Sequence, residues 1–548
     1  MKKKHIWCGA IAFLLLLITF YTDTKIFTTD PLNMNCLPID IEMSKVMHVL
    51  TKVGVFCVFF GLAEFFAYSW NHKKTLLFPF LIFLGIYGAG LLVTYPGYFM
   101  SDDPIIWGYA TRYYPVYWHH YLTSLYYMIG MSMMPASMGP VFLSDICYSL
   151  VYAYIFHRAS EIYSTKIKYG VAILALLPST LLGALMCFRP ALYTPFFVFY
   201  FAMLFFDYKK KAELTKGKLF FLLLLTVVLC QWRSEGLVLI VFAPFLLAIA
   251  YRIFPCANDT TTESKNETNS FSNRCFKQFP IVKILAALLV FVVLFTIVKL
   301  PQSIGEKKYY GKDYLIISTT RPLSVIVHRE QTYEGAQEDL ANVGAITEFG
   351  YLHNDSLSCS AYNRYNTDYN EGRYTQTGAD EQTQSAYIKS AFRLILKNFD
   401  LYLGERLQLF LVTNGIYNYN KEMVLNLKPV VSNDFHLYNH DRDYGFELLD
   451  AYKRIPVEGS DSYALFLYKF GGEAYIPCLI LAMALLVGSF IKKKWFLAIK
   501  ILSLFAREAI IFLSAPASFI QYSYPMMFVT MFATFAVLCE LREQKHMD

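Results

Sequence analysis

Charged residues are scarce in this sequence. Asp, Glu, Lys and Arg make up 17% of its 548 residues, whereas hydrophobic residues make up 56%. Soluble domains average about 25% charged and about 45–50% apolar residues. A chain this long and this apolar cannot bury its side chains in one or two soluble cores, which excludes a soluble enzyme, a fibrous protein and a disordered chain.

The sequence also lacks the patterns typical of metal and nucleic-acid binding. Its 11 cysteines form no C-x-x-C pair, so their spacing indicates neither a zinc site nor a disulfide framework. The net charge of +7 is too small an excess to predict a nucleic-acid partner. No internal repeat stands out, and we expect no cofactor, with a divalent ion left as an open alternative.

Long apolar runs are what the sequence has instead. A helix of about 20 residues spans the hydrocarbon core of a bilayer, and about twelve runs come near this length. We therefore expect an all-α polytopic protein embedded in the lipid bilayer. The runs cover residues 6–20, 46–70, 75–95, 136–156, 168–187, 191–206, 219–232, 237–253, 281–298, 475–491, 495–514 and 519–538.

Lysine and arginine gather in every second loop between these runs, as at residues 73–74, 209–218 and 492–494. Loops of this kind face the cytoplasm. The pattern predicts an integral, multi-pass protein of the cytoplasmic membrane with both termini in the cytoplasm. Residues 119–134 are apolar enough to cross, but a crossing there would reverse every later loop, so we expect an interfacial or re-entrant helix on the outer face.

Three regions follow from this topology. Residues 1–298 form an N-terminal transmembrane region of about nine helices, with an outer loop at 96–135. Residues 299–472 are polar, have no spanning run, and are predicted to form an α-rich extracytoplasmic domain. Residues 473–548 form a C-terminal transmembrane region of about three helices.

Ionisable side chains at the edge of a bilayer are candidates for function because their burial is costly. The topology places several at one outer level, in a mixed acidic and basic set: Asp102, Asp103, Arg189, Arg233, Glu235, Arg507 and Glu508. Two alternatives remain open. The Arg233–Glu235 and Arg507–Glu508 pairs could be local ion pairs that fix helix packing, and the two aspartates could form a turn or cap ahead of Pro104.

The outer loop also carries His119 and His120 among many aromatic residues. Aromatic rings at a membrane surface serve as interface anchors, and they are also platforms on which the apolar face of a sugar stacks. Adjacent histidines point to different sides of a helix, so the pair is a weak metal site.

At these residues the chain resembles the GT-C superfamily of integral membrane glycosyltransferases. The bacterial branch has an outer loop with Tyr-Pro-Gly, then Ser-x-Asp-Ser, then His-Pro about fifteen to twenty residues later. Here Tyr95-Pro96-Gly97 precedes Ser101-Asp102, and Trp118-His119 follows. Asp103 replaces the usual Ser, and His120 replaces the usual Pro.

Two further segments fit that branch. Residues 232–237, with Arg233 and Gly236, are similar to its Arg-x-x-Gly-Leu turn, and Tyr522-Ser523-Tyr524-Pro525 is similar to its Arg-Tyr-x-x-Pro element, with Gln521 in place of the arginine. The resemblance covers residues 75–254 and the last two apolar runs, and it does not cover 299–472.

The resemblance implies a transferase that moves a sugar from a polyprenyl-phosphate donor to an extracytoplasmic glycan, lipid or protein acceptor, with inversion. Asp102 would be the general base and Asp103 its partner or substitute. The substrate-binding set would be His119, His120, Arg189, Arg233, Glu235, Arg507, Glu508, Tyr522 and Tyr524, with the three arginines on the donor phosphate. The rival interpretations are a transporter or lipid-linked-glycan flippase, which typically shows repeats and charges in both halves of the bundle, and a non-catalytic assembly subunit.

Overall fold

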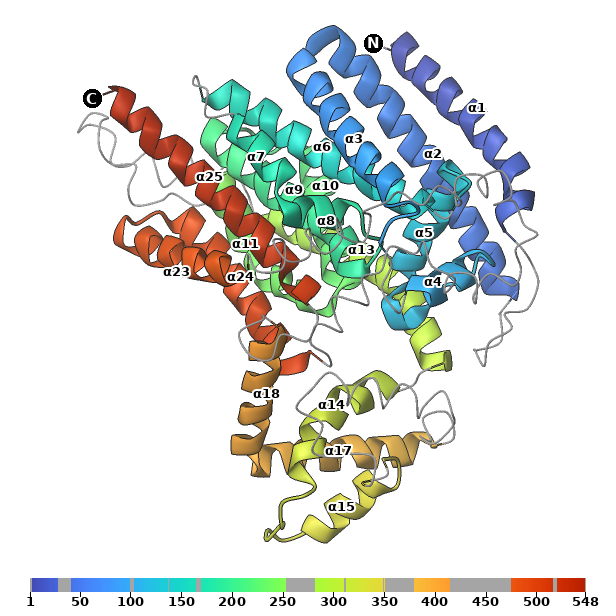
Figure 1. The fold of residues 1–548 in the computed structure, drawn as a ribbon, viewed down its shortest axis with the longest axis vertical. Helices are drawn as coiled ribbons and strands as arrows, with labels where there is room; N and C mark the ends of the chain where they lie inside the picture. Colours follow the sequence, from blue (N-terminus) through green and yellow to red (C-terminus); the bar gives the residue numbers. More distant parts are fainter. Residues whose placement is uncertain are drawn as a thin grey trace.

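The computed structural model describes residues 2–27, 41–98, 103–136, 138–163, 169–252, 281–309, 312–347, 349, 379–413, 475–515 and 520–547. Over these ranges the protein is all-α, with 19 α-helices and no sheet (Figure 1). The predicted fold class is confirmed at this level.

The α-helices are α1 (Lys2–Ile26), α2 (Ile41–His72), α3 (Lys74–Val93), α4 (Asp103–Ala110), α5 (Tyr121–Met133), α6 (Gly139–Ile162), α7 (Gly170–Leu176), α8 (Pro178–Ala184), α9 (Arg189–Lys210), α10 (Lys216–Trp232), α11 (Val238–Ala250), α13 (Ile281–Tyr309), α14 (Asp313–Ile326), α15 (Ala336–Gly344), α17 (Glu381–Lys397), α18 (Phe399–Thr413), α23 (Tyr475–Ile491), α24 (Trp495–Ser514) and α25 (Tyr524–Met547). Three short 3-10 helices join them: η1 (Tyr117–His119), η3 (Ser234–Leu237) and η7 (Ile520–Ser523).

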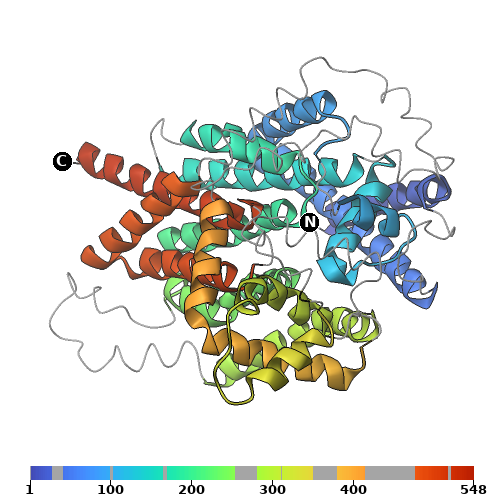
Figure 2. The same ribbon diagram turned by 60° about the horizontal axis from the view of Figure 1, so that its bottom comes forward.

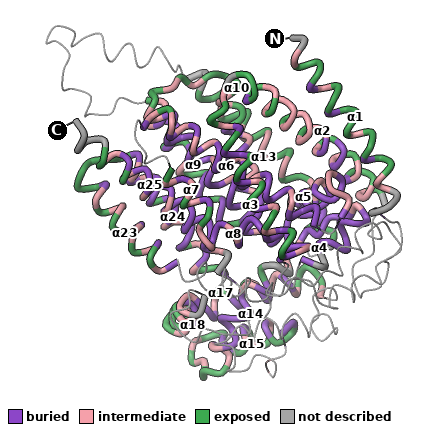
Figure 3. The backbone as a smooth tube through the Cα atoms, turned by 45° about the horizontal axis from the view of Figure 1, so that its top comes forward, coloured by how far each residue is buried: buried purple, intermediate pink, exposed green. Residues whose placement is uncertain are grey.

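Seven of the described helices, α1, α2, α3, α6, α9, α13 and α25, are long and apolar enough to cross a membrane. Their burial differs strongly: the most apolar window of α9 is 83% buried and that of α6 is 72% buried, whereas that of α13 is 0% buried (Figure 3). Because α13 exposes leucine, isoleucine and valine side chains along its length, its surface suits hydrocarbon better than water. The prediction of a multi-pass membrane protein is therefore supported at the level of these seven helices.

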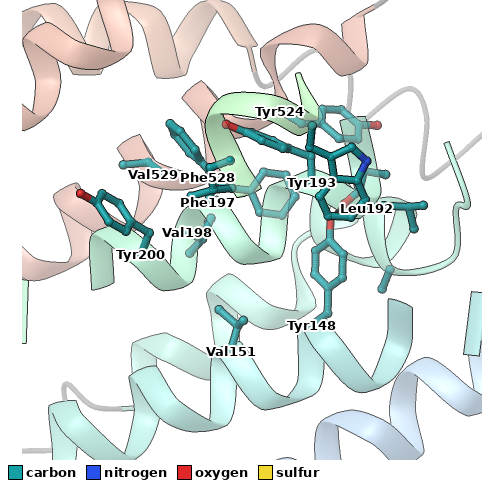
Figure 4. Packing of buried hydrophobic residues seen from close by; sticks show 14 of the residues in the cluster. Tyr148, Val151, Leu192, Tyr193, Phe197, Val198, Tyr200, Tyr524, Phe528 and Val529 are labelled. Atoms are coloured by element: carbon teal, nitrogen blue, oxygen red, sulfur yellow. Dashed lines mark hydrogen bonds between the residues drawn. The ribbon is translucent and has the colours of Figure 1, made fainter. Parts of the chain in front are cut away.

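The centre of the bundle is an aromatic-rich core between α6, α9 and α25. Tyr148 of α6 meets Phe528 of α25 edge to face, with ring centroids 6.1 Å apart, and its hydroxyl donates to the carbonyl of Ala191 at 3.0 Å (Figure 4). Pairing the phenol with a backbone carbonyl satisfies a polar group that would be costly to bury alone. These three helices thus form the fixed frame on which the less buried helices pack.

The two ends of the bundle differ in charge. Both described termini lie at one end (Figure 1), where lysines at helix ends pair with acidic residues of other helices. Lys73 pairs with Glu161 at 2.8 Å, Lys218 with Asp207 at 3.0 Å, and Lys494 with Glu540 at 2.8 Å. The loops that the sequence assigns to one side of the membrane therefore lie together at this lysine-rich end.

A small helical bundle of α14, α15, α17 and α18 lies at the opposite end (Figures 1 and 2). It has its own core, in which Ile316, Leu323 and Leu394 are fully buried. It is joined to the long helices where Arg406 of α18 donates to the carbonyl of Ala515 at 2.7 Å. The helix α13 continues past the predicted boundary at 298 and ends at Tyr309.

The predicted span at 168–187 is not one continuous helix. The segment forms two helices, α7 and α8, of seven residues each. Pro178 starts α8, and Leu177 before it is extended with ψ of 142°, because a proline disfavours the helical conformation of the residue that precedes it. The segment predicted as interfacial contains α5, whose 13 residues reach about 20 Å, short of the bilayer core.

The Tyr-Pro-Gly segment forms a tight turn after α3 and contacts the chain between α8 and α9. Tyr98 donates its backbone N–H to the carbonyl of Leu185 at 2.9 Å and forms a bridge with Met186. Gly97 has φ of +110°, and a Cβ there would lie 2.7 Å from Cγ2 of Val141. Both the backbone conformation and the space therefore require glycine at this position.

We expect Gly97→Ala to lower the free energy of unfolding by about 1–3 kcal/mol, because alanine adopts this backbone conformation only with strain. The matched control is Gly88→Ala inside α3, where an added Cβ meets nothing within 4 Å and alanine favours the helix by up to about 1 kcal/mol. Thermal unfolding of both variants in detergent measures the difference. Equal melting temperatures would contradict a structural role for the turn.

Candidate functional site

The first candidate region is the outer loop with its paired aspartates. Asp102, the predicted base, lies outside the described residues. Asp103 begins α4 and is fully buried, close enough to Tyr127 of α5 for its charge to act on that phenol. Asp103 therefore lies at the start of α4 near α5, and the alternative of a turn or cap stays a prediction.

Residues 117–121, here called the histidine loop, are held by hydrogen bonds from three separate helices. The carbonyl of His119 accepts from the Thr123 hydroxyl at 2.7 Å, and that hydroxyl accepts from the indole of Trp232 at 3.0 Å. Gln302 of α13 donates to the carbonyl of Tyr117 at 2.6 Å and accepts from the backbone N–H of Tyr121 at 2.9 Å. The loop is thus fixed by α5, α10 and α13 before any ligand arrives.

His120 caps helix α5. Its φ is +69°, and its Nδ1 accepts from the backbone N–H of Leu122 at 3.3 Å. This bond orients the ring and leaves Nε2, which is buried and has no hydrogen-bond partner within the described residues. Nε2 of His120 is therefore a buried polar atom that can still form a hydrogen bond.

Burial, with the help of two arginines, sets the charge state of the histidines. Burial, and then the positive charges of Arg189 and Arg233, hold the pKa of His119 well below its usual range. Burial and Arg189 lower the pKa of His120 to about 3. Both imidazoles are therefore neutral at physiological pH, and they can donate or accept a hydrogen bond without adding charge.

A second polar cluster lies at the turn between α10 and α11. Glu235 of η3 forms an ion pair with Arg233. It forms a second ion pair with Arg507 of α24, in which Oε1 of Glu235 lies 2.9 Å from Nη2 of Arg507. Arg507 also pairs with Glu508 at 2.9 Å. All four side chains are buried, with Arg507 at 0% exposure, so two positive and two negative charges compensate one another inside the protein.

Of residues 522–524, Tyr522 and Ser523 contact this cluster and Tyr524 does not. Tyr522 places its ring 5.2 Å from the guanidinium of Arg233. Glu508 accepts from the hydroxyls of Ser523 at 3.2 Å and Tyr475 at 3.1 Å. Tyr524 instead packs against Phe528 in the central core, with centroids 5.8 Å apart, which indicates a structural role for it.

The structure therefore divides the predicted set. His119 and His120 lie in the field of Arg189, and His119 also in that of Arg233, whereas Arg507 and Glu508 lie in the charge-neutral cluster. The predicted local pairs both form, and Glu235 joins them, which the sequence could not show.

Several residues of the site were missed from the sequence. Gln302, Thr123 and Trp232 position the histidine loop, and Gln302 stands out in retrospect as an amide at the end of a strongly apolar helix. Asp145, which the sequence already marks as an ionisable residue inside an apolar run, is fully buried in the second turn of α6, with both carboxylate oxygens unpartnered within the described residues. No group of three His, Cys, Asp or Glu side chains placed to hold a metal occurs in the part of the chain that the structure describes.

Comparison of the chain with known proteins gives no match to a family model, to a curated protein or to a solved structure. The class rests on the fold alone: over the residues that the structure describes, the protein is all-helical and has seven helices long and apolar enough to span a membrane. The GT-C resemblance and the activity it implies stay predictions.

We expect Glu235→Gln to destabilise the protein by about 3–5 kcal/mol, because it leaves two buried guanidinium groups with one carboxylate between them. The matched control is Glu42→Gln, which removes one carboxylate from an exposed pair with Lys45 and should change stability little. The melting temperatures of the two variants in detergent test this prediction. A similar small shift for both variants would mean that the cluster does not hold the helices together.

Proposed function

We propose that this protein is an integral membrane glycosyltransferase of the GT-C type. It would transfer a sugar from a polyprenyl-phosphate donor to an acceptor hydroxyl outside the cell, with inversion. One observation carries the proposal: two histidines of the aspartate-bearing outer loop lie in the positive field of arginines from the start of α9 and the end of α10.

The arginines suit a phosphate because a guanidinium offers paired N–H donors that match its oxygens. Arg189 is partly exposed, and Arg233 is held by Glu235 and Tyr522. We assign these two to the donor phosphate. Arg507 is fully buried between two carboxylates, so its proposed role is to position Glu235, and through it Arg233.

The proposed reaction has three parts. Asp102 takes the proton of the acceptor hydroxyl, the oxygen attacks the anomeric carbon, and the bond from that carbon to the phosphate oxygen breaks with its electron pair going to the phosphate. The arginines stabilise the charge that grows on the departing phosphate. The neutral histidines would donate or accept hydrogen bonds from the sugar or the acceptor.

The proposal includes an orientation. The lysine-rich end, with both termini, would face the cytoplasm, as loops rich in lysine and arginine do. The small bundle and the histidine loop would then lie outside. On this arrangement the helices beyond the seven long ones, among them α10, α11, α23 and α24, supply the remaining spans of the about twelve expected.

Asp102→Asn should lower donor turnover by about 100-fold or more, since a positioned general base contributes on that order. The purified protein is incubated in detergent with a panel of polyprenyl-phosphate hexoses and pentoses that carry a labelled sugar. Release of polyprenyl phosphate is measured, because it reports transfer both to an acceptor and to water.

The control for this variant is Asp400→Asn, in the exposed pair that Asp400 forms with Arg329 in the small bundle, and it should leave turnover unchanged. Unchanged turnover in a folded Asp102→Asn protein would remove Asp102 as the base. Lipid translocation in vesicles without any donor consumption would favour the flippase instead.

Cysteine labelling tests the orientation. Glu338→Cys in α15 and Lys216→Cys at the start of α10 both replace exposed side chains, at opposite ends of the molecule (Figure 1). With a membrane-impermeant maleimide on intact cells, only Glu338→Cys should gain label over the parent protein. Both variants should gain label after lysis, and a gain at position 216 in intact cells would invert the proposal.

A further inference from the structure

The lysine-rich end contains a cavity of about 300 Å³ between α9, α24 and α25. Lys209 at the end of α9, Lys494 ahead of α24 and Glu540 of α25 lie at its mouth, and Lys500 of α24 lines it. This volume is at the lower limit for small-molecule sites. It suits a compact polar group and excludes a whole lipid or nucleotide.

Lys500 is the unusual member of this set. Its side chain is 0% exposed, and its Nζ has no hydrogen-bond partner within the described residues. The ammonium faces rings instead, at 4.5 Å from the centroid of Phe532 and 5.7 Å from that of Phe205. Ring faces attract a cation, but they supply no hydrogen-bond acceptor for its three N–H groups.

The charge of the cavity is positive. Glu540 is shared by Lys209, at 2.6 Å, and Lys494, at 2.8 Å. One carboxylate therefore faces three lysines, which leaves the site short of negative charge. Among the described residues Glu540 is the one carboxylate that lines the cavity. A buried ammonium without a carboxylate is costly, so an anion that reaches Lys500 would stabilise it.

The walls indicate what carries this anion. Phe496, Leu497 and Val537 line the same cavity, and Lys500 lies six residues after Lys494, about 9 Å further along the helix. The ammonium thus lies within the apolar layer, behind a polar mouth. A soluble anion gains nothing from such walls, whereas a lipid brings its phosphate through the mouth to Lys500 and keeps its chains outside the cavity, on the apolar surface of the helices.

We propose that this cavity binds the phosphate of an anionic phospholipid, with Lys500 as the innermost contact and Lys209 and Lys494 at the mouth. In the orientation proposed above, this lipid belongs to the cytoplasmic leaflet, where anionic headgroups meet basic pockets between helices. The site lies at the opposite end from the histidine loop, and its test does not depend on the transferase activity.

Lipid competition measured by native mass spectrometry tests the proposal. The full-length protein is stripped of lipid in detergent and then offered phosphatidylglycerol and phosphatidylcholine in equal amounts. Wild type should retain phosphatidylglycerol, and Lys500→Met should lose about fivefold or more of it, the effect of one lysine near an anionic headgroup. Lys492→Met is the matched control, because Lys492 is an exposed lysine at the same end and should leave binding unchanged.

Melting temperatures provide a second measurement. Phosphatidylglycerol should raise the melting temperature of wild type and of Lys492→Met, and it should raise that of Lys500→Met much less. Equal retention of phosphatidylglycerol by Lys500→Met and wild type overturns the proposal. If Lys500→Met does not fold, wild type decides: equal binding of phosphatidylcholine, or displacement of the lipid by inorganic phosphate, overturns the anionic-lipid assignment.

Discussion

The carboxylate of Glu235 is the contact on which the proposed outer site depends. It pairs with Arg233 in its own turn and with Arg507 of α24. Arg507 also pairs with Glu508. Glu508 in turn accepts hydrogen bonds from Tyr475 and Ser523. In a low-dielectric interior an unpaired charge is very costly, so each of these buried charged groups needs the others as partners. The cluster therefore fixes α10, α23, α24 and α25 relative to one another.

A second network fixes the histidine loop, and it is built from neutral groups. Gln302, Thr123 and Trp232 hold the backbone of residues 117–121 from three helices. The two networks meet at the end of α10, where Trp232 belongs to one and Arg233 to the other. A rigid surround of this kind holds polar groups in place before a ligand binds, which is the arrangement that catalysis by positioning requires.

The two ends of the molecule treat charge differently. At the lysine-rich end, Lys210 pairs with Glu161 and Lys494 with Glu540, all of them partly exposed, so water shares the cost of each charge. At the opposite end, the charges of the Glu235 cluster are buried and compensate one another. Lys500 is the exception, because it is buried at the lysine-rich end and has no carboxylate partner among the described residues. This is why we propose a lipid phosphate beside it.

The sequence by itself determined the helical class, the long apolar segments and the grouping of lysines at one end. These properties are local: an apolar run has to form a helix in lipid, since its backbone groups find no other partners there. The topology predicted from these segments also singled out Arg233, Glu235 and Arg507 as ionisable residues at one level.

Only the tertiary structure decided which of these residues meet. The break at Pro178 was readable from one residue, yet the run around it is apolar throughout and was predicted as a single span. That Glu235 joins two arginines from distant helices, that Tyr524 belongs to the core, and that Gln302 holds the histidine loop depend on helix packing. Packing is set by shape and by the pairing of buried charges across hundreds of residues, and neither is visible in a single segment of sequence.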